Sequence, residues 1–553
     1  MGKKIVIVGG VAAGATAAAK ARRVSEDAEI TIIEKNSYIS YANCGLPYYI
    51  GKIIPQKKNI ILHTKSTFSN RFNTNVMLNT TASFIDPETK KIVAENNSGR
   101  QVIEYDKLIL ATGGKPVIPN IEGLNDVEYH FVRSVEDAEN IVEKLDTAKS
   151  VLIVGGGYIG IEMAEAFYHA GLNTTLVEYE KNILPIFEPE CSLKIYDEAI
   201  KCGIDIRTGT ALIKVEKVDD KIKCYLSDKR EIAVDLLILA TGVRPDTSLA
   251  QTAGIKIGEL GGVIVNEKME TSVKDIYAAG DMVEKHNLIT GKNCLMPLAG
   301  PANREGRVAG CNAAGGDMTF KGVVGASVVS FNNAVVAHTG LTMKQALNEG
   351  FDAQCIYVEN AHHAEYYPDP KFIFLKLIYD KSSGKILGAT ASGEEGVARR
   401  IDVISTAIYG NMTVFDLENL DLCYSPPHGS AKDVEHMAGY VASNQLRGEG
   451  FGITPEYFLE LEKGDWHFQL LDVRTKIEHK MFHLENSINI YINDLRNHLD
   501  ILDKDTPVVV YCAVGFRGYL ATRILRNLGF KAYNILGGIE AVKRFKKIYQ
   551  GAL

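Results

Sequence analysis

The sequence predicts an α/β chain in which two doubly wound domains come first and further mixed domains follow. A short apolar run at residues 4–10 leads through a glycine-containing turn and an alanine-rich stretch to a second apolar run at residues 29–34. The same order recurs from Val151 through Gly160 to Glu178. A β-α-β unit that occurs twice indicates two parallel sheets, each with a ligand site at its strand ends.

Length and composition agree with several domains. The 553 residues suggest three or four domains, and a net charge of −7 argues against a nucleic-acid or acidic membrane surface as partner. Nine scattered cysteines without a C-x-x-C pair favour a reduced, cytoplasmic setting and no metal site. Because glycines interrupt the apolar stretch from Ile5 to Ala19, it indicates a strand-to-helix turn and neither a targeting signal nor a membrane span.

The first glycine turn predicts an FAD site. Gly9 and Gly14 keep the outer glycines of the G-x-G-x-x-G pattern, whereas Val11 replaces the middle one. The following helix N-terminus offers free N–H groups to a pyrophosphate, and Glu34, twenty residues after Gly14, is placed to bind a ribose hydroxyl. A later segment ends in Asp281, which is suited to accept from a ribitol hydroxyl. The alternative is a purely structural turn.

The second turn predicts a nicotinamide dinucleotide site. Gly155, Gly157 and Gly160 match the pattern in full, and the acidic Glu178 favours NADH over NADPH, although Lys181 nearby weakens that preference. The candidate cofactor residues at both sites are Gly9, Gly10, Ala12, Ala13, Gly14, Glu34, Lys35, Ala111, Thr112, Gly113, Gly155, Gly157, Tyr158, Ile159, Gly160, Glu178, Gly242, Gly280, Asp281, Pro297, Leu298 and Ala299.

A lone cysteine follows the first β-α-β unit. Cys44 stands in the segment Ser40–Tyr48, and the next cysteine in the sequence is Cys191. A flavin-linked disulfide reductase of the usual kind needs two neighbouring cysteines. Cys44 is therefore expected to react with an external thiol, sulfur atom or oxygen.

These motifs resemble the pyridine nucleotide–disulfide oxidoreductases over roughly residues 1–445. The segment around Cys44 resembles the single-cysteine branch, which includes coenzyme A disulfide reductases, NADH oxidases and NADH peroxidases. The oxidases and peroxidases carry a histidine in the first glycine turn, where this chain has Ala12, and this difference favours the coenzyme A members. The resemblance implies an α+β dimerisation domain and a homodimer.

The resemblance also implies a coenzyme A site. Lys20 and Arg23 share a helix face and, with Arg71 and Lys432, are suited to neutralise phosphate charges, although solvated surface charge is the alternative for each. The expected substrate residues are Thr16, Lys20, Arg23, Ser40, Asn43, Arg71, Asn303 and Lys432.

The resemblance to the coenzyme A members further implies two tyrosines that reach Cys44 from the partner subunit and act as proton donors. One is Tyr424, and the other is Tyr366 or Tyr367, with Tyr366 favoured by the spacing. A phenol with an ordinary pKa near 10 can protonate a departing thiolate. The alternative is that a tyrosine before a proline only packs in a turn.

The C-terminal part resembles a rhodanese domain over about residues 453–550. Cys512 ends an apolar strand and begins a tight loop, and the loop N–H groups and Arg517 are expected to lower the pKa of its thiol and to stabilise a persulfide. The loop from Cys512 to Arg517 spans six residues, whereas related phosphatases on the same scaffold use a longer loop. This length favours sulfur transfer over phosphate chemistry. A buried structural cysteine is the alternative.

The sequence predicts four domains and one linker. They are an FAD domain at 1–115 and 245–322, an NAD(P)H domain at 116–244, a dimerisation domain at 323–445, a linker at 446–452 and a rhodanese domain at 453–553.

The predicted function is NAD(P)H-dependent, flavin-linked reduction of coenzyme A disulfide, coenzyme A persulfide or polysulfide at Cys44, coupled to sulfur transfer at Cys512. One rival is an NADH oxidase or peroxidase that cycles Cys44 through a sulfenic acid. Another is a redox sensor that carries persulfide at Cys44 and Cys512 for a protein partner.

Overall fold

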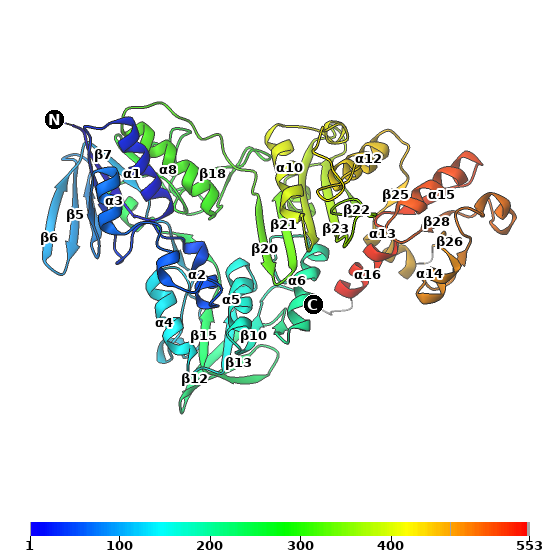
Figure 1. Cartoon of the computed structure of the whole chain (residues 1–553), viewed down its shortest axis with the longest axis horizontal. Coiled ribbons are helices and arrows are strands. Elements are labelled where there is room, and N and C mark those ends of the chain that lie inside the picture. The colour runs from blue at the N-terminus through cyan, green and yellow to red at the C-terminus, as the bar shows by residue number, and fades with distance from the viewer. Residues whose placement is uncertain (1, 465, 550–553) are drawn as a thin grey trace. The chain divides into compact units, whose positions relative to one another are not determined.

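The computed structural model describes residues 2–464 and 466–549, which form two compact units. The first unit contains the described residues up to Tyr179 together with Cys202–Val323. The second contains Glu180–Lys201 and the described residues from Val324 onward (Figure 1). No helix in the described part of the chain combines the length and the apolar character that a membrane span requires.

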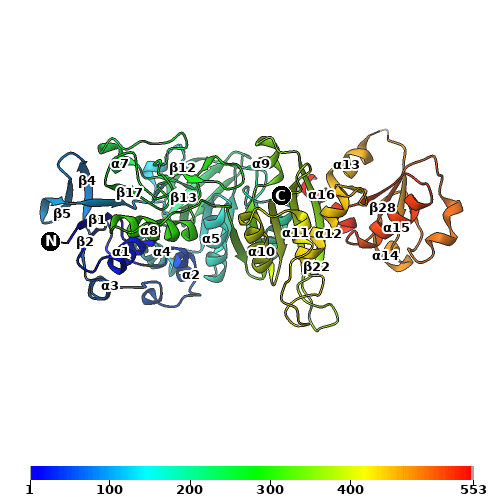
Figure 2. The ribbon, with the colours of Figure 1, turned by 90° about the horizontal axis from the view of Figure 1, so that it is seen from above.

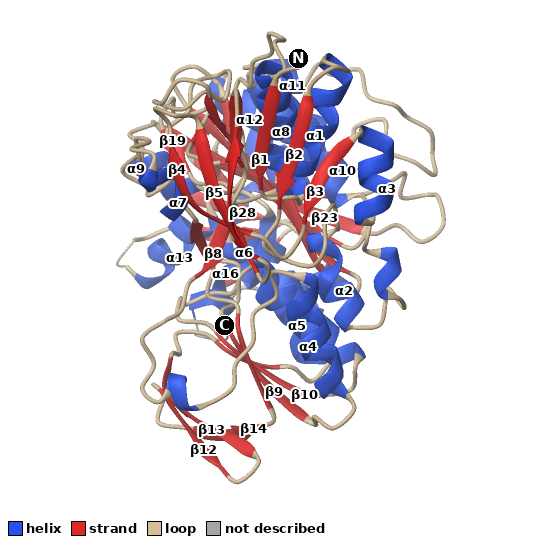
Figure 3. Ribbon diagram, turned by 90° about the vertical axis from the view of Figure 1, so that its left-hand side faces the viewer, coloured by secondary structure: helices blue, strands red, loops and turns tan. Residues whose placement is uncertain are grey.

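The first unit opens with a sheet of five parallel strands (Figure 3). Their order is β17 (Ile276–Ala278), β7 (Lys107–Leu110), β1 (Lys4–Val8), β2 (Glu29–Ile33) and β3 (Thr74–Met77). One sheet face packs on α1 (Ala12–Val24) and α8 (Ala299–Ala313), and the other packs on α7 (Ser248–Thr252) and the strands β4 (Thr81–Asp86), β5 (Lys91–Asn96) and β6 (Gly99–Glu104).

Helices α1 and α8 lie side by side and touch through small residues (Figures 1 and 2). A Cβ atom at Gly306 would lie 2.2 Å from the carbonyl oxygen of Ala13, and one at Gly310 would lie 2.1 Å from that of Ala17. Both distances are far below van der Waals contact. The two glycines of α8 therefore permit the close approach to the alanine-rich helix α1.

A second, four-stranded parallel sheet completes the nucleotide-binding pattern of the first unit. Its order is β11 (Asp205–Arg207), β10 (Asn173–Val177), β9 (Ser150–Val154) and β15 (Leu236–Leu239). The accompanying elements are α4 (Val135–Leu145), α5 (Tyr158–His169) and the antiparallel strands β12 (Leu212–Val218), β13 (Lys221–Leu226) and β14 (Glu231–Val234). The expected domain boundaries at 115 and 245 fall in a two-stranded ladder of β8 (Gly114–Pro116) and β16 (Val243–Pro245).

The second unit begins with a five-stranded antiparallel sheet. Its order is β20 (Ser327–Phe331), β21 (Ala334–Gly340), β24 (Ile386–Gly393), β23 (Phe372–Asp380) and β22 (Ala353–Ala361), with α10 (Val397–Tyr409) and α12 (Val434–Leu446) beside it. Helix α6 (Pro189–Lys201) belongs here, although the sequence-based boundaries place it in the range 116–244. Lys376 on β23 explains this, because its ammonium lies 2.9 Å from the carboxylates of both Glu188 and Glu190.

A five-stranded parallel sheet forms the C-terminal part of the second unit. Its strands are β25 (Gly452–Ile453), β29 (Ala532–Ile535), β28 (Val508–Tyr511), β26 (Gln469–Asp472) and β27 (Ser487–Asn489). Its helices are α13 (Pro455–Lys463), α14 (Lys476–Met481), α15 (Phe516–Asn527) and α16 (Gly538–Tyr549). Short elements elsewhere are α2 (Leu46–Ile50), α3 (Lys65–Phe72), β18 (Lys285–His286), β19 (Asn293–Cys294), α9 (Met343–Asn348) and α11 (Val414–Leu417).

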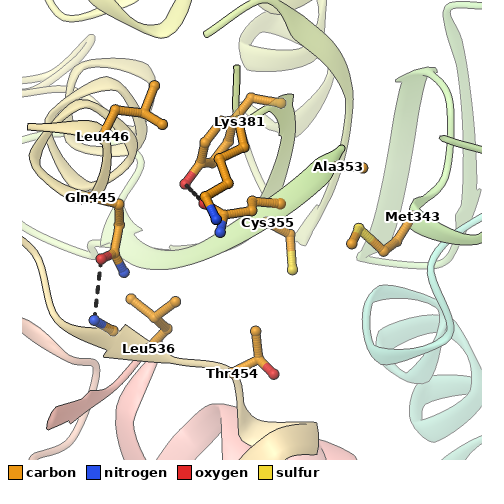
Figure 4. A pocket seen from close by; sticks show the side chains of 11 residues that line it. Met343, Ala353, Cys355, Lys381, Gln445, Leu446, Thr454 and Leu536 are labelled. Carbon is orange, nitrogen blue, oxygen red and sulfur yellow. Dashed lines mark hydrogen bonds between the residues drawn. The ribbon is translucent and has the colours of Figure 1, made fainter. Parts of the chain in front are cut away.

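The segment expected as a linker, residues 446–452, is held by hydrogen bonds. The side-chain oxygen of Gln445 accepts from the N–H of Gly452 at 3.2 Å, beside a pocket of about 440 Å³ (Figure 4). Arg523 on α15 donates to the carbonyl of Glu449 at 2.9 Å. These contacts tie the segment to both of its neighbours within the second unit.

Candidate functional site

The two outer positions of the first glycine turn have no room for any side chain. Gly9 has a φ of +100°, and a Cβ atom there would lie 2.2 Å from the carbonyl oxygen of Ala111. A Cβ atom at Gly14 would lie 1.8 Å from the carbonyl oxygen of Gly9. Val11, where the pattern expects the middle glycine, has a negative φ of −99°, so this position does not need the left-handed backbone that favours glycine. Helix α1 begins at Ala12, so its N-terminal N–H groups open toward the turn.

The second turn repeats this construction. Gly155 has a φ of +110°, and a Cβ atom at Gly160 would lie 1.9 Å from the carbonyl oxygen of Gly155. Tyr158 and Ile159 form the first turn of α5. Both turns fit a pyrophosphate because backbone N–H groups can approach it without side-chain interference. The residues therefore suit FAD at the first turn and a nicotinamide dinucleotide at the second.

An acidic residue braces each turn from the end of the second strand. Glu34 accepts from the N–H groups of Gly10 at 2.7 Å and Asn36 at 2.9 Å, and Glu178 accepts from Gly156 at 2.6 Å. Burial raises the pKa of Glu34. Each carboxylate oxygen has more than one lone pair, so these bonds leave acceptor capacity for a ribose hydroxyl. Lys35 is exposed beside Glu34.

Arg133 contacts two of the residues expected at the flavin, Asp281 and Gly113. Its guanidinium donates to the carboxylate of Asp281 at 3.0 Å and lies 3.3 Å from the Cβ position of Gly113. Glu305, which is fully buried, accepts from the N–H of Gly280 at 2.8 Å. Sequence reasoning missed Arg133 and Glu305, because neither belongs to a motif. The remaining expected positions are Thr112, whose hydroxyl donates to the Asp246 carbonyl at 2.6 Å, Gly242, which precedes β16, and Pro297, Leu298 and Ala299 at the start of α8.

Cys44 lies in a short 3-10 helix, η1 (Asn43–Gly45), and is exposed. The side-chain oxygen of Asn43 accepts from the Cys44 N–H at 3.1 Å and lies 3.7 Å from its sulfur. Partial burial of the sulfur raises the pKa of the thiol, and the carboxylates of Glu162 and Asp281 raise it further. These two acids come from α5 and from the expected flavin turn. Cys44 is thus near both candidate cofactor sites.

Glu162 is a further functional candidate that sequence reasoning missed. It stands two residues after Gly160 in the second turn of α5, so its closeness to the glycine motif was an available signal. Burial, helped by the like charge of Glu165, raises its pKa to about 7. The side chain of Glu162 therefore gains its negative charge near neutral pH, as is common for groups at functional sites.

Replacing Glu162 by glutamine is expected to make Cys44 more reactive above neutral pH. The wild-type carboxylate disfavours the thiolate, so its removal lowers the pKa of Cys44 and raises the rate of iodoacetamide alkylation at pH 8 about three-fold. At pH 6 Glu162 is mostly protonated, and the two proteins should react at similar rates. Glu143→Gln, which removes an exposed carboxylate of α4, is the control. Equal alkylation at pH 8 would contradict the coupling.

Only some of the expected coenzyme A residues come together. The hydroxyl of Thr16 donates to the side-chain oxygen of Asn303 at 2.6 Å, which joins α1 to α8. Lys20 and Arg23 extend along α1, whereas Arg22 is buried and donates to backbone carbonyls. The others are Ser40, which is buried with a φ of +49°, Asn43 beside Cys44, Arg71, which is exposed on α3, and Lys432, which is exposed in the second unit.

The structure distinguishes the two neighbouring tyrosines. The hydroxyls of Tyr366 and Tyr424 lie 2.9 Å apart and share a hydrogen bond, and this bond raises the pKa of Tyr366. Tyr367 instead packs edge-on against the ring of His363, with centroids 5.4 Å apart. Tyr366, and not Tyr367, is therefore the residue whose hydroxyl pairs with that of Tyr424.

The sulfur of Cys512 lies in a loop whose carbonyls point away from it. The residue is 1% exposed, and the N–H of Gly515 donates to its sulfur at 3.1 Å. The carbonyl oxygens of Cys512 and Ala513 accept from the N–H groups of Ile539 at 2.9 Å and Glu540 at 3.1 Å. The expected closing turn at Gly537–Ile539 thus supports the loop. Arg517 also interacts with the sulfur and forms two hydrogen bonds with Glu478, a partner that the sequence did not suggest.

Two glycine-turn domains, a cysteine near both turns and a second cysteine in a tight loop define a two-dinucleotide redox enzyme with an added sulfur-handling domain. The chain belongs to the pyridine nucleotide-disulphide oxidoreductases, whose family model matches residues 3–306. The dimerisation domain of that family matches residues 326–434, and a rhodanese-like domain matches residues 454–545. The fold class predicted from the sequence is confirmed.

Similar proteins cover the whole chain or its reductase part. The crystal structure of reduced Bacillus anthracis CoADR-RHD is 36% identical, covers 98% of each chain and superposes with a TM-score of 0.95. A Pyrococcus horikoshii NAD(P)H coenzyme A polysulfide/persulfide reductase is 35% identical over 78% of this chain and 97% of its own length. An NADH oxidase of Methanocaldococcus jannaschii is 36% identical over 80% of this chain and 99% of its own length.

Proposed function

We propose that the chain is an FAD-dependent NAD(P)H reductase of coenzyme A disulfide and coenzyme A persulfide, with Cys44 as its redox cysteine. The observation that carries the proposal is the position of Cys44, which is exposed and whose thiol pKa is raised by partial burial and by the charges of Glu162 on the expected nicotinamide helix and Asp281 of the expected flavin turn. Cys44 forms no disulfide in the described part of the chain, so it has no intrachain redox partner there. The relatives named for coenzyme A persulfide and CoADR-RHD support the substrate class.

The chemistry assigned to Cys44 is disulfide exchange. Its thiolate attacks a sulfur of the substrate that is bonded to coenzyme A, which forms a mixed disulfide and breaks the substrate S–S bond. Coenzyme A thiolate or hydrosulfide leaves with the bonding electron pair and takes a proton from the Tyr366–Tyr424 pair. FAD and NAD(P)H, when bound, supply the electron pair that reduces the mixed disulfide. The side-chain oxygen of Asn43 orients the cysteine by accepting from the backbone N–H of Cys44.

A homodimer completes this site in the proposal. Cys44 belongs to the first unit, whereas both tyrosines belong to the second and lie within the range of the dimerisation domain. The tyrosine hydroxyls are exposed as a pair, which leaves them available to a partner subunit. We assign the pair to the Cys44 of the other protomer, and Lys432 to the phosphates of coenzyme A bound there.

NADH is the proposed preferred donor. Glu178 is held toward the second turn by the N–H of Gly156, where its carboxylate can accept from a ribose hydroxyl and would repel a 2′-phosphate.

Persulfide sulfur carried by Cys512 is proposed to supply the reductase with substrate. The shared chain and the second cysteine loop support this coupling.

Substrate kinetics test the proposal. We expect kcat/KM for coenzyme A disulfide or persulfide with NADH to exceed that for oxygen or peroxide, and NADH to exceed NADPH. The rival oxidase function has support from the NADH oxidase relative, whereas Ala12 stands where the oxidases and peroxidases carry a histidine. Faster turnover with oxygen than with any coenzyme A substrate would assign the protein to that rival function.

Replacing Tyr366 or Tyr424 by phenylalanine is expected to slow substrate reduction by about 10²-fold or more, because a positioned general acid contributes about 10²–10⁴-fold. Flavin reduction by NADH should stay normal. Since the two hydroxyls share one hydrogen bond, the double variant should lose less than the product of the single losses. Tyr367→Phe should turn over almost normally. Stopped-flow measurements separate the two half-reactions, and normal turnover in both single variants would remove the tyrosines from the mechanism.

A further inference from the structure

The positive charge beside Cys512 is already matched by a carboxylate. Arg517 donates through its two terminal nitrogens to the two oxygens of Glu478, at 2.9 and 2.6 Å. The same guanidinium also interacts with the Cys512 sulfur. Arg517 therefore presents a paired charge to whatever approaches Cys512, whereas an unpaired guanidinium would present its full charge.

Glu478 is built into this position by its own helix. It is the third residue of α14, and its carboxylate accepts from the N–H of Thr475 at 3.0 Å and from the Thr475 hydroxyl at 2.8 Å. These bonds and Arg517 lower the pKa of Glu478 to about 2, so the carboxylate is charged at any working pH. The pairing is thus a fixed feature of the loop.

The charged groups around the loop add no net positive charge. Val514, Gly515 and Phe516 border a pocket whose charged lining residues are Lys432, Glu359 and Glu365, so one lysine faces two carboxylates there. The side chains between Cys512 and Arg517 belong to Ala513, Val514, Gly515 and Phe516, and none of them is charged. Arg474, which is buried in the same domain, is paired with Asp472 at 2.7 Å. A dianionic sulfur donor such as thiosulfate therefore meets little net positive charge, whereas a donor with one negative charge loses less.

We propose that Glu478 sets the donor specificity of Cys512, because its pairing with Arg517 favours sulfur donors with a single negative charge over dianionic thiosulfate. This inference rests on the proposed sulfurtransferase role of Cys512. In the transfer, a bond forms between the Cys512 sulfur and the terminal sulfur of the donor, and the S–S bond of the donor breaks. The remainder of the donor leaves with that electron pair as a thiolate, sulfinate or sulfite, so no separate oxidant or reductant is needed.

Two donors that differ mainly in charge test the proposal on the full chain. Thiosulfate and methanethiosulfonate both carry a transferable sulfur on a sulfonyl group, but the first has two negative charges and the second has one. With cyanide as acceptor, Glu478→Gln should raise the ratio of kcat/KM for thiosulfate to that for methanethiosulfonate at least about ten-fold, mainly through the KM for thiosulfate. That KM should also become more sensitive to salt, because an unpaired guanidinium is then exposed to the dianion.

Two further variants separate charge from structure. Glutamine keeps the helix cap of α14, since glutamine and glutamate both serve at this cap position. Glu478→Asp keeps the charge and should keep the wild-type ratio. Glu462→Gln removes a carboxylate of the same domain that pairs with Lys546 instead, and it should leave both donors unaffected.

Three outcomes would overturn the proposal. An unchanged ratio in an active Glu478→Gln variant would show that the carboxylate does not select the donor. An equal loss with both donors would reduce Glu478 to a support of the loop. A wild-type protein that is no faster with either donor than Cys512→Ser would refute the sulfurtransferase role itself, and with it this inference.

Discussion

Replacing Cys44 by serine is expected to abolish reduction of coenzyme A disulfide and persulfide, by on the order of 10³-fold or more, while FAD remains bound and reducible by NADH. The flavin site is built from the glycine turn at Gly9–Gly14, Glu34 and Asp281, none of which needs a thiol. Serine is nearly isosteric but cannot form the mixed disulfide. Anaerobic titration with NADH, followed by addition of substrate, separates the two half-reactions.

The matched control is Cys423→Ser. Cys44 and Cys423 are the two exposed cysteines of the described chain, so the control tests whether exposure of a thiol is sufficient. We expect Cys423→Ser to retain substrate reduction. Retained disulfide reduction in Cys44→Ser would refute the central proposal, and loss of it in Cys423→Ser alone would transfer the redox role to Cys423.

Replacing Cys512 by serine is expected to eliminate sulfur transfer from persulfide donors, again by on the order of 10³-fold, because no other group in the loop can carry the transferred sulfur. The N–H of Gly515 that now donates to the sulfur would remain in place. Reduction of coenzyme A disulfide added directly should be unaffected. Hydrogen sulfide release is the measurement that follows the persulfide route.

The comparison between two supply routes makes the test of Cys512 specific. Persulfide turnover that depends on transfer by Cys512 should fall in the serine variant, and preformed coenzyme A persulfide should restore it. The two cysteines lie in different compact units, and a free substrate needs only Cys44. Equal loss by both routes would mean that Cys512 takes part in the reductive step, and the proposed division of labour would be wrong.

The glycine turns could be predicted from the sequence because backbone sterics leave little choice there. At Gly9 and Gly155 a positive φ and a close carbonyl exclude a side chain, and that exclusion leaves a visible pattern. Arg133 and Glu305 left no such pattern. Each acts across long sequence separations, on Asp281 and Gly280 respectively, and only the fold brings these partners together.

The domain boundaries show the same limit. The strand and helix pattern places residues 180–201 with the nucleotide domain that surrounds them in sequence. Buried ion pairs between Lys376 and two glutamates at the start of this segment instead fix α6 in the second unit. No characteristic spacing in a sequence signals an ion pair between distant residues, so this assignment needed the structure.

The contact between α1 and α8 limits which residues near the proposed coenzyme A site can be substituted. Because Gly306 and Gly310 lie against the backbone of α1, any side chain larger than hydrogen at either position would force the two helices apart. The hydrogen bond between Thr16 and Asn303 joins the same two helices, so a larger residue at either glycine would also disturb that bond. We therefore expect the proposed coenzyme A site to tolerate substitution at exposed residues such as Arg23 better than at these two glycines.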